Sequence, residues 1–187
     1  MQFEAPSGYP LGTNKAFKIA ATFLIPLLAI LTKRDWRGAK NIPKSGPVIV
    51  ISNHVSYADA LVFAHYLYGN GRAVRYLGKD SVFRIPILGK IILSSGQIPV
   101  ARESDKASHA LDSALGLLEA GHCVGIYPEG TLTRDENLWP MVAKTGIARL
   151  AIISKAPVIP VAQWGDQNLL APYSKKVVLW KRTKITY

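Results

Sequence analysis

The sequence predicts an α/β fold, a single domain with a mainly parallel central sheet flanked by helices and preceded by an N-terminal helical segment. Short apolar runs of strand length recur along the chain, and their apolar residues are consecutive, as in strands buried on both faces. Helix-length segments separate these runs, which is typical of parallel sheets. The 187 residues show no internal repeat, low-complexity tract or linker, and this length suits one core.

The N-terminal segment is apolar from residue 16 to residue 31 and then meets charged residues. Its sixteen residues, interrupted by Lys18 and Pro26, fall short of the ~20 that cross a bilayer. We therefore expect a helix lying in the membrane interface, with an ordinary buried core helix as the alternative. The cations expected at the lipid headgroups are Lys15, Lys18, Lys33 and Arg34. This divides the chain into a membrane-interface helical segment, residues 1–35, and an α/β domain, residues 36–187.

The α/β domain should contain four buried strands and three long helices. The strands are expected at residues 47–52, 73–77, 123–127 and 158–162, which are apolar and rich in β-branched residues. The helices are expected at residues 56–68, 105–120 and 144–153. The chain ends at residues 185–187 in an apparent strand, which leaves open a further C-terminal portion.

Composition limits the kinds of partner and site. Lys and Arg number 23 against 12 acidic residues, a net charge of +11, which favours an anionic partner such as nucleic acid, phospholipid headgroups or a phosphorylated substrate. The 49% hydrophobic content argues against disorder. Because Cys123 is the single cysteine, the chain has no intrachain disulfide framework and no Cys-rich zinc site.

His54 and Asp59 stand where catalytic groups gather in parallel sheets, just after the carboxyl end of a strand. Within one continuous helix, side chains five residues apart would point roughly 140° apart. They can meet if His54 precedes the helix, with Ser56 as the N-cap and Asp59 at the third helical position. The carboxylate would then fix the imidazole tautomer and leave the other ring nitrogen as a base. The alternative is a capping box beside an ordinary loop histidine.

Two further groups of polar residues follow apolar runs. The loop at residues 128–134 contains a carboxylate, a glycine, hydroxyls and a cation. Arg102 ends the apolar segment 97–102, and its guanidinium suits bidentate phosphate binding. The candidate binding residues of the loop are Glu129, Gly130, Thr131 and Arg134.

In four ordered blocks, the chain resembles the glycerolipid acyltransferase family, specifically the bacterial 1-acyl-glycerol-3-phosphate acyltransferases. Residues 53–59, NHVSYAD, resemble the family's N-H-x-S-x-x-D block. Residues 98–102, 127–131 and 157–162 resemble the second, third and fourth blocks. The resemblance runs from about residue 41 to residue 162.

The resemblance assigns roles to individual residues. His54 and Asp59 would form the catalytic dyad, and Arg102 would bind the acceptor's phosphate. Glu129, Gly130 and Thr131 would help to bind the glycerol phosphate, and the fourth block is associated with the acyl donor.

The third block departs from the family in one place. Leu132 stands where a basic residue usually follows Gly-Thr. Arg134, two residues later, and Lys79, which follows the strand 73–77, are therefore alternative phosphate-binding cations. A plain surface role is equally open for each of them.

The resemblance implies an enzyme of phospholipid biosynthesis. It would transfer a fatty acyl group from acyl-CoA or acyl carrier protein to the free hydroxyl of 1-acyl-glycerol-3-phosphate, a lysophosphatidic acid, giving phosphatidic acid. Its expected partners are an anionic membrane surface, a lysophospholipid acceptor and an acyl thioester donor, without nucleic acid. We expect a peripheral or monotopic protein on the cytoplasmic face of the cell membrane, with no metal and no cofactor beyond the thioester co-substrate.

Other functions remain open from the residues alone. The acceptor could be another lysolipid or a glycolipid. The basic stretch 175–184 would suit a nucleic-acid-binding module, but no helix-turn-helix, zinc-finger or aromatic RNA-binding pattern accompanies it. The dyad could instead belong to a hydrolase, although no G-x-S-x-G motif is present. Another alternative is a metal site formed by His54, Asp59 and Glu129.

Overall fold

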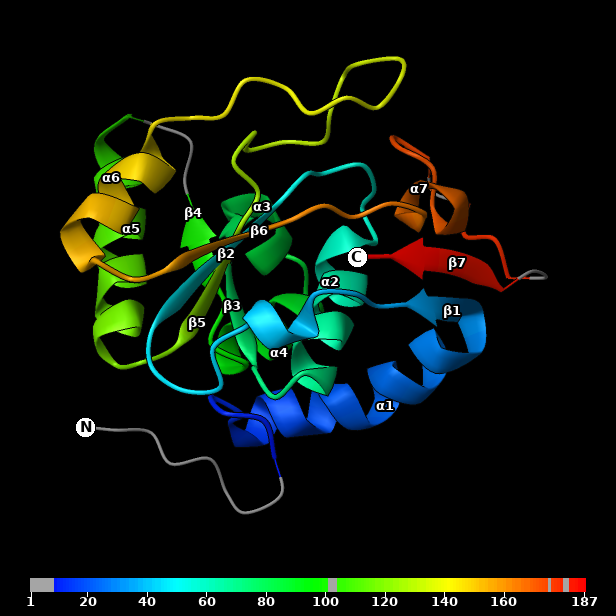
Figure 1. Cartoon of the computed structure of the whole chain (residues 1–187), viewed down its shortest axis with the longest axis horizontal. Coiled ribbons are helices and arrows are strands. Elements are labelled where there is room, and N and C mark those ends of the chain that lie inside the picture. Colours follow the sequence, from blue (N-terminus) through cyan, green and yellow to red (C-terminus); the bar gives the residue numbers. More distant parts are fainter. Residues whose placement is uncertain (1–8, 101–103, 175, 180–181) are drawn as a thin grey trace.

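The computed structural model describes residues 9–100, 104–174, 176–179 and 182–187. Its central sheet has five strands, each parallel to its neighbours, in the order β4-β3-β5-β2-β6 (Figure 1). The predicted α/β class and mainly parallel sheet are therefore confirmed. The strands are β2 (Val48–Ser52), β3 (Val74–Lys79), β4 (Ile98–Val100), β5 (Cys123–Ile126) and β6 (Val158–Val161).

The apolar runs of the sequence form the middle of this sheet. Val48, Ile49 and Val50 of β2 are fully buried, because helices cover both faces of the strand. The strand β3 is longer than predicted, since its last residues Gly78 and Lys79 pair with β4. Local periodicity could not show this extension, because it depends on pairing with a distant segment.

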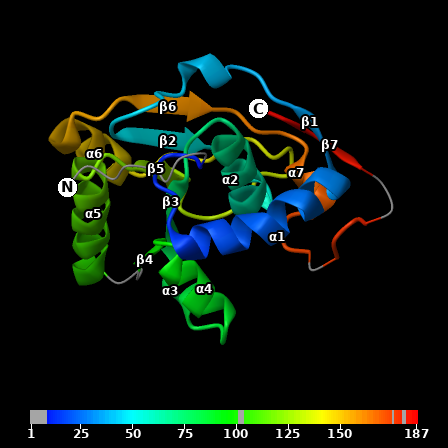
Figure 2. The same ribbon diagram turned by 90° about the horizontal axis from the view of Figure 1, so that it is seen from below.

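Helices cover the two faces of the sheet (Figures 1 and 2). The helices α5 (Ser104–Glu119) and α6 (Gly146–Ser154) pack on one face, around Ile49 and Val124. The helix α2 (Asp59–Gly69) packs on the other face, around Val50 and Val74. These three helices match the predicted ones, except that α2 begins three residues later than expected.

Several short helices were not predicted, because too few residues show a helical period. They connect the long elements, and two of them lie in succession between β3 and β4. They are the 3₁₀ helix η1 (Ala39–Asn41) and the helices α3 (Asp80–Phe83), α4 (Leu88–Ser94) and α7 (Asp166–Leu169).

The N-terminal helix α1 (Lys15–Leu31) confirms the helix predicted at residues 16–31. It begins at Asn14, whose side chain accepts a hydrogen bond from the backbone N–H of Phe17 at 2.8 Å. One stripe of α1 packs on the domain through Phe17, Ala21 and Leu28. Across the described residues, no helix combines the length and the apolar character needed to cross a membrane.

The segment that follows α1 meets the last strand of the described chain beside α2. The strand β1 (Thr32–Asp35) pairs in parallel with β7 (Thr183–Thr186), as Figure 1 shows. Trp164 forms an antiparallel bridge with Thr186, which brings α7 to the same place. Tyr187 then stacks on Tyr66 of α2, with ring centroids 4.6 Å apart. The end of the chain is thus part of the packing around α2.

Candidate active site

His54 and Asp59 form a hydrogen-bonded pair at the carboxyl end of β2. The distance from His54 Nδ1 to Asp59 Oδ2 is 2.8 Å, and Asp59 is fully buried. An ionised carboxylate can only accept hydrogen bonds, so Nδ1 carries the proton and Nε2 keeps its lone pair. The predicted contact between the two side chains is therefore confirmed.

The same carboxylate oxygen organises the start of α2. Asp59 Oδ2 accepts hydrogen bonds from the backbone N–H groups of Val55 at 2.6 Å and Ser56 at 2.9 Å. Ser56 Oγ accepts from the backbone N–H of Ala58 at 3.0 Å, so the two side chains form a variant of a capping box. The regular helix begins only at Asp59, because Asp59 N–H bonds to the carbonyl of Ser56, three residues back.

Opposing effects act on the pKa of Asp59. Burial raises it above its usual value, while hydrogen bonds from the His54 ring and from the backbone of Ser56 and Val55 lower it. Every group that lowers it belongs to the loop between β2 and α2. The loop therefore stabilises the charge that the histidine needs beside it.

The loop after β5 supports the dyad from the other side. The ring of Tyr127 stacks on the His54 ring, with centroids 4.1 Å apart and planes at 19°. Glu129 is buried and accepts hydrogen bonds from the backbone N–H groups of His54 at 3.1 Å and Met141 at 2.9 Å. Thr133 N–H donates to the carbonyl of His54 at 2.8 Å. The two loops are thus joined at His54.

Gly130, Thr131 and Leu132 line a cavity next to His54. The backbone of Gly130 is left-handed, with φ of 71°. A Cβ at this position would lie 2.9 Å from Nζ of Lys144, so this exposed cation stands beside the third block. Sequence reasoning missed Lys144, because it lies beyond the loop in a stretch without a motif.

The predicted cations are distributed unequally around this cavity. Lys79, at the end of β3, lines it. Arg134 is exposed and does not belong to the lining. Arg102 lies outside the described residues. Among the predicted cations, Lys79 therefore lines the cavity that His54 also lines, and the unpredicted Lys144 lies beside Gly130 of the same lining.

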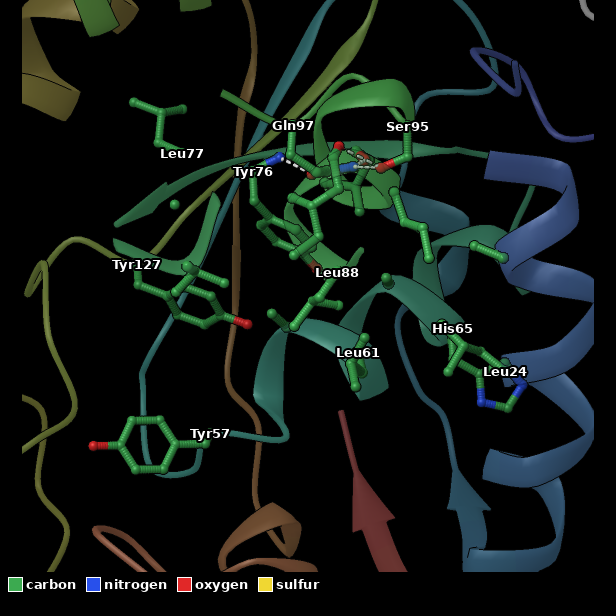
Figure 3. A pocket seen from close by; sticks show the side chains of 18 of the residues that line it. Leu24, Tyr57, Leu61, His65, Tyr76, Leu77, Leu88, Ser95, Gln97 and Tyr127 are labelled. Carbon is green, nitrogen blue, oxygen red and sulfur yellow. Dashed lines mark hydrogen bonds between the residues drawn. The ribbon is translucent and has the colours of Figure 1, made fainter. Parts of the chain in front are cut away.

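The cavity itself has a volume of about 500 Å³ and an apolar wall (Figure 3). It runs between α1, α2, β3 and the short helices α3 and α4. In Figure 3, Tyr76 and Tyr127 lie at one side, and Leu24 and His65 lie beside α1 at the other. Apolar residues in its wall include Phe17, Leu24, Leu61, Leu77, Phe83, Leu88 and Ile91.

Two polar groups of the wall, the Tyr76 backbone and the His65 ring, have hydrogen-bond partners. The backbone N–H of Tyr76 donates to Gln97 Oε1 at 2.7 Å. His65 Nε2 lies 3.1 Å from Arg34 Nη2, and burial together with this cation lowers the pKa of His65 to about 4. The histidine is therefore neutral near pH 7, and Nε2 accepts from Arg34. The His65 ring therefore adds no charge to the wall, which can accommodate an apolar chain.

Comparison with known proteins gives the family. A family model described as "Acyltransferase" matches residues 33–164. The 1-acyl-sn-glycerol-3-phosphate acyltransferase of Borreliella burgdorferi is 31% identical over 132 residues, which cover 70% of this chain and 51% of that protein. The chloroplastic 1-acyl-sn-glycerol-3-phosphate acyltransferase BAT2 of Brassica napus is 28% identical over 148 residues, 78% of this chain and 41% of that protein. The chain thus spans about half the length of these two relatives.

A solved structure shares the fold. The crystal structure of the 1-acyl-sn-glycerophosphate acyltransferase PlsC from Thermotoga maritima matches with a TM-score of 0.68 and 24% identity. The match covers 90% of this chain and 65% of that one. The residues matched by the family model, 33–164, span His54, Asp59, Tyr127 and Glu129 of the site described above. The chain belongs to the acyltransferase family.

Proposed function

We propose that this protein transfers a fatty acyl group from an acyl thioester to the free hydroxyl of 1-acyl-glycerol-3-phosphate, forming phosphatidic acid. The observation that carries the proposal is the His54–Asp59 pair, 2.8 Å apart, beside an apolar cavity of about 500 Å³. The names of the relatives from Borreliella burgdorferi and Brassica napus support the acceptor. The donor is acyl-CoA or acyl carrier protein, and the reaction needs no further cofactor.

The dyad would act by general-base catalysis. His54 Nε2 removes the proton from the acceptor hydroxyl as the hydroxyl oxygen attacks the thioester carbonyl. Asp59 holds the ring through Nδ1 and stabilises the imidazolium. The carbon–sulfur bond then breaks, and the departing thiolate takes the proton from His54. The products are the ester and the free thiol, and no covalent acyl-enzyme forms.

The acceptor's phosphate would be held by cations at the edge of the cavity. Lys79 lines the cavity, and Lys144 stands against Gly130 in the third block. Arg102 is a third candidate, on the family resemblance. Positive charge here would orient the acceptor with its hydroxyl toward His54. Glu129, whose oxygens accept from the His54 and Met141 backbone, would act by holding this loop in place.

The apolar cavity would accommodate an acyl chain. Its wall is formed by α1, α2, α3 and α4, with His54 at its edge. Burying apolar surface contributes about 25 cal/mol per Å², so a fatty chain gains binding energy along this wall.

The membrane surface would supply the lipid acceptor. One face of α1 leaves Phe23 74% and Ile30 68% exposed, although it packs on the domain along its other face. An apolar helix face flanked by lysines binds at the headgroup boundary and is attracted by anionic lipid. We propose that α1 places the protein peripherally on the cytoplasmic face of the membrane.

An acceptor panel tests the reaction. The purified protein receives one acyl-CoA together with lysophosphatidic acid, other lysophospholipids, a glycolipid or no acceptor, and products are identified by mass spectrometry. Phosphatidic acid should form fastest, and little free fatty acid should appear without an acceptor. Free fatty acid formed equally in all samples would indicate a hydrolase, and preference for a neutral acceptor would refute the phosphate-bearing substrate.

A further inference from the structure

A group of buried acids and tyrosines adjoins the dyad. We call it the tyrosine–aspartate cluster, and its members are Asp59, Tyr76, Tyr127, Asp166 and Tyr187. Asp59 Oδ1, the Tyr187 hydroxyl and both carboxylate oxygens of Asp166 are buried without a hydrogen-bond partner among the described residues, and the hydroxyls of Tyr76 and Tyr127 interact only with each other. Burying a polar group without a hydrogen bond lowers the stability of the fold, so a role for these atoms has to be considered.

The sheet brings two of the tyrosines together. Tyr76 of β3 is in register with Gly125 of β5, and Tyr127 follows two residues later on the same face. Their rings lie 5.9 Å apart at 15°. A Cβ at Gly125 would lie 2.5 Å from the Tyr76 ring, so glycine is what allows the ring to lie over this strand.

The segment that carries Asp166 is attached to the dyad loop on both sides. Before it, the backbone N–H of Gln163 donates to Asn53 Oδ1 at 2.9 Å. After it, Ser56 Oγ donates to the carbonyl of Leu170 at 2.7 Å. Asp166 lies between these two attachments and is fully buried. Its segment therefore packs directly on the loop that holds His54 and Asp59.

The cluster members affect one another electrostatically. Burial raises the pKa of Asp166 to about 8, and the charge of Asp59 contributes to the rise. Burial also raises the pKa of Tyr76, Tyr127 and Tyr187, and both carboxylates add to the effect. Among the described residues, no cation forms an ion pair with Asp166.

We propose that Asp166 is a positioning residue of the acyl-transfer site, which keeps a proton on its carboxyl group and leaves Asp59 as the charged member of the cluster. This inference rests on the proposed function. Asp59 Oδ1 can only accept hydrogen bonds, whereas a protonated Asp166 and the tyrosine hydroxyls can donate them. A neutral Asp166 thus adds a donor without placing a second negative charge next to the dyad. When Asp166 loses its proton, a second negative charge stands beside the buried carboxylate of Asp59.

Infrared difference spectroscopy of the full chain tests the protonation directly. The wild type is compared with Asp166→Asn, and Asp112→Asn is the matched control, since Asp112 is exposed on α5. We expect the carbonyl stretch of a protonated carboxyl group at neutral pH, lost as the pH rises through about 8. It should be missing from Asp166→Asn and retained in Asp112→Asn. A wild-type spectrum without this signal would overturn the proposal.

The coupling to the dyad needs its own readout. In Asp59→Asn the midpoint of the Asp166 signal should fall by roughly one pH unit, because the neighbouring negative charge is removed. The chemical shifts of the His54 ring, followed by NMR in the wild type, should report the loss of the Asp166 proton near pH 8, and this change should be missing from Asp166→Asn. An unmoved midpoint, or the same change near pH 8 in both proteins, would contradict the positioning role.

These measurements need no substrate, so they separate this proposal from the proposed function. If the protein forms no phosphatidic acid but the infrared and NMR results hold, the acyl-transfer reaction is wrong and the protonated Asp166 stands. If acyl transfer occurs, its pH profile should show a transition near pH 8 that disappears in Asp166→Asn and persists in Asp112→Asn. Identical profiles in all three proteins would refute the effect of Asp166 on the reaction.

Discussion

At the scale of single residues, Asp59 has two tasks that converge on one atom. Oδ2 accepts from His54 Nδ1 and also from the backbone N–H groups that open α2. Substitution by asparagine keeps an oxygen that can accept from the backbone but removes the charge that stabilises an imidazolium. Substitution by alanine removes both.

Asp59→Asn should therefore lower kcat by at least about 100-fold, because the base loses its orienting carboxylate. Asp59→Ala should lose a similar amount of activity and also about 1 kcal/mol of stability through the missing cap. Steady-state kinetics and urea unfolding of the two variants separate the tasks. Near-normal activity of Asp59→Asn would contradict the role given to this carboxylate.

The cations near Gly130 lead to a second prediction at this scale. Replacing Lys79 or Lys144 by alanine should raise KM for lysophosphatidic acid about 10-fold, as expected for the loss of one charge-assisted contact. KM for the acyl donor should change less. Arg134→Ala is the control, since Arg134 is exposed and outside the cavity lining. A larger effect from Arg134 than from either lysine would refute this placement.

At the scale of elements, the helix α1 joins the domain and leaves an apolar face uncovered. Phe17, Ala21 and Leu28 are buried, whereas Phe23 and Ile30 are largely exposed. The same helix lines the cavity next to the dyad. A membrane bound to this face would lie close to the proposed acyl-chain cavity.

The double substitution Phe23→Ser and Ile30→Ser should weaken binding to anionic vesicles about 10-fold or more, since each large side chain contributes roughly 1.5–3 kcal/mol when buried. Ile152→Ser is the control, because Ile152 is equally exposed but lies on α6. Vesicle co-sedimentation measures both. Equal loss in the control and the α1 variant would argue against a specific membrane-binding face.

Elements with a clear local period could be predicted from the sequence, and those that depend on distant pairing could not. The buried strands and the helices α1, α5 and α6 follow from apolar spacing alone. The strand β1 is polar, and it forms because β7 pairs with it from the far end of the chain. The turn before α2 was also missed, because backbone N–H groups donate to Asp59 Oδ2 and Ser56 Oγ and delay the regular helix by three residues.

In the site, too, residues with a local sequence pattern could be predicted and residues placed by distant contacts could not. The meeting of His54 and Asp59 follows from their spacing at a strand end. Lys144 and Asp166 carry no local pattern, and their places follow from a glycine contact and from hydrogen bonds between remote loops. The four blocks resembled a family that the comparisons confirm.

At the scale of the whole molecule, burial of Asp166 should make stability depend on pH. Its pKa is about 8 in the folded state against an ordinary 3.8, so the folded state binds more protons between these values. The contribution is full below about pH 4 and is lost as the pH rises through about 8. It can fall by at most about 1.4 kcal/mol per pH unit.

The free energy of unfolding of the wild type minus that of Asp166→Asn isolates this group, because other ionisable residues cancel. The difference should decline steadily from pH 5 to pH 8, in urea titrations at about one-unit steps. A difference that stays constant over this range would mean that Asp166 is ionised in the folded protein at every pH tested.

The rate of acyl transfer by His54→Ala tests the central claim most directly. Phosphatidic acid formation from lysophosphatidic acid and acyl-CoA is measured at saturating substrates for the wild type, His54→Ala and His109→Ala. His109 is an exposed histidine on α5, far from the dyad in the sequence and outside the cavity lining. We expect a loss of at least about 100-fold in His54→Ala and wild-type rates in His109→Ala. A His54→Ala rate within a few-fold of the wild type would contradict general-base catalysis by His54.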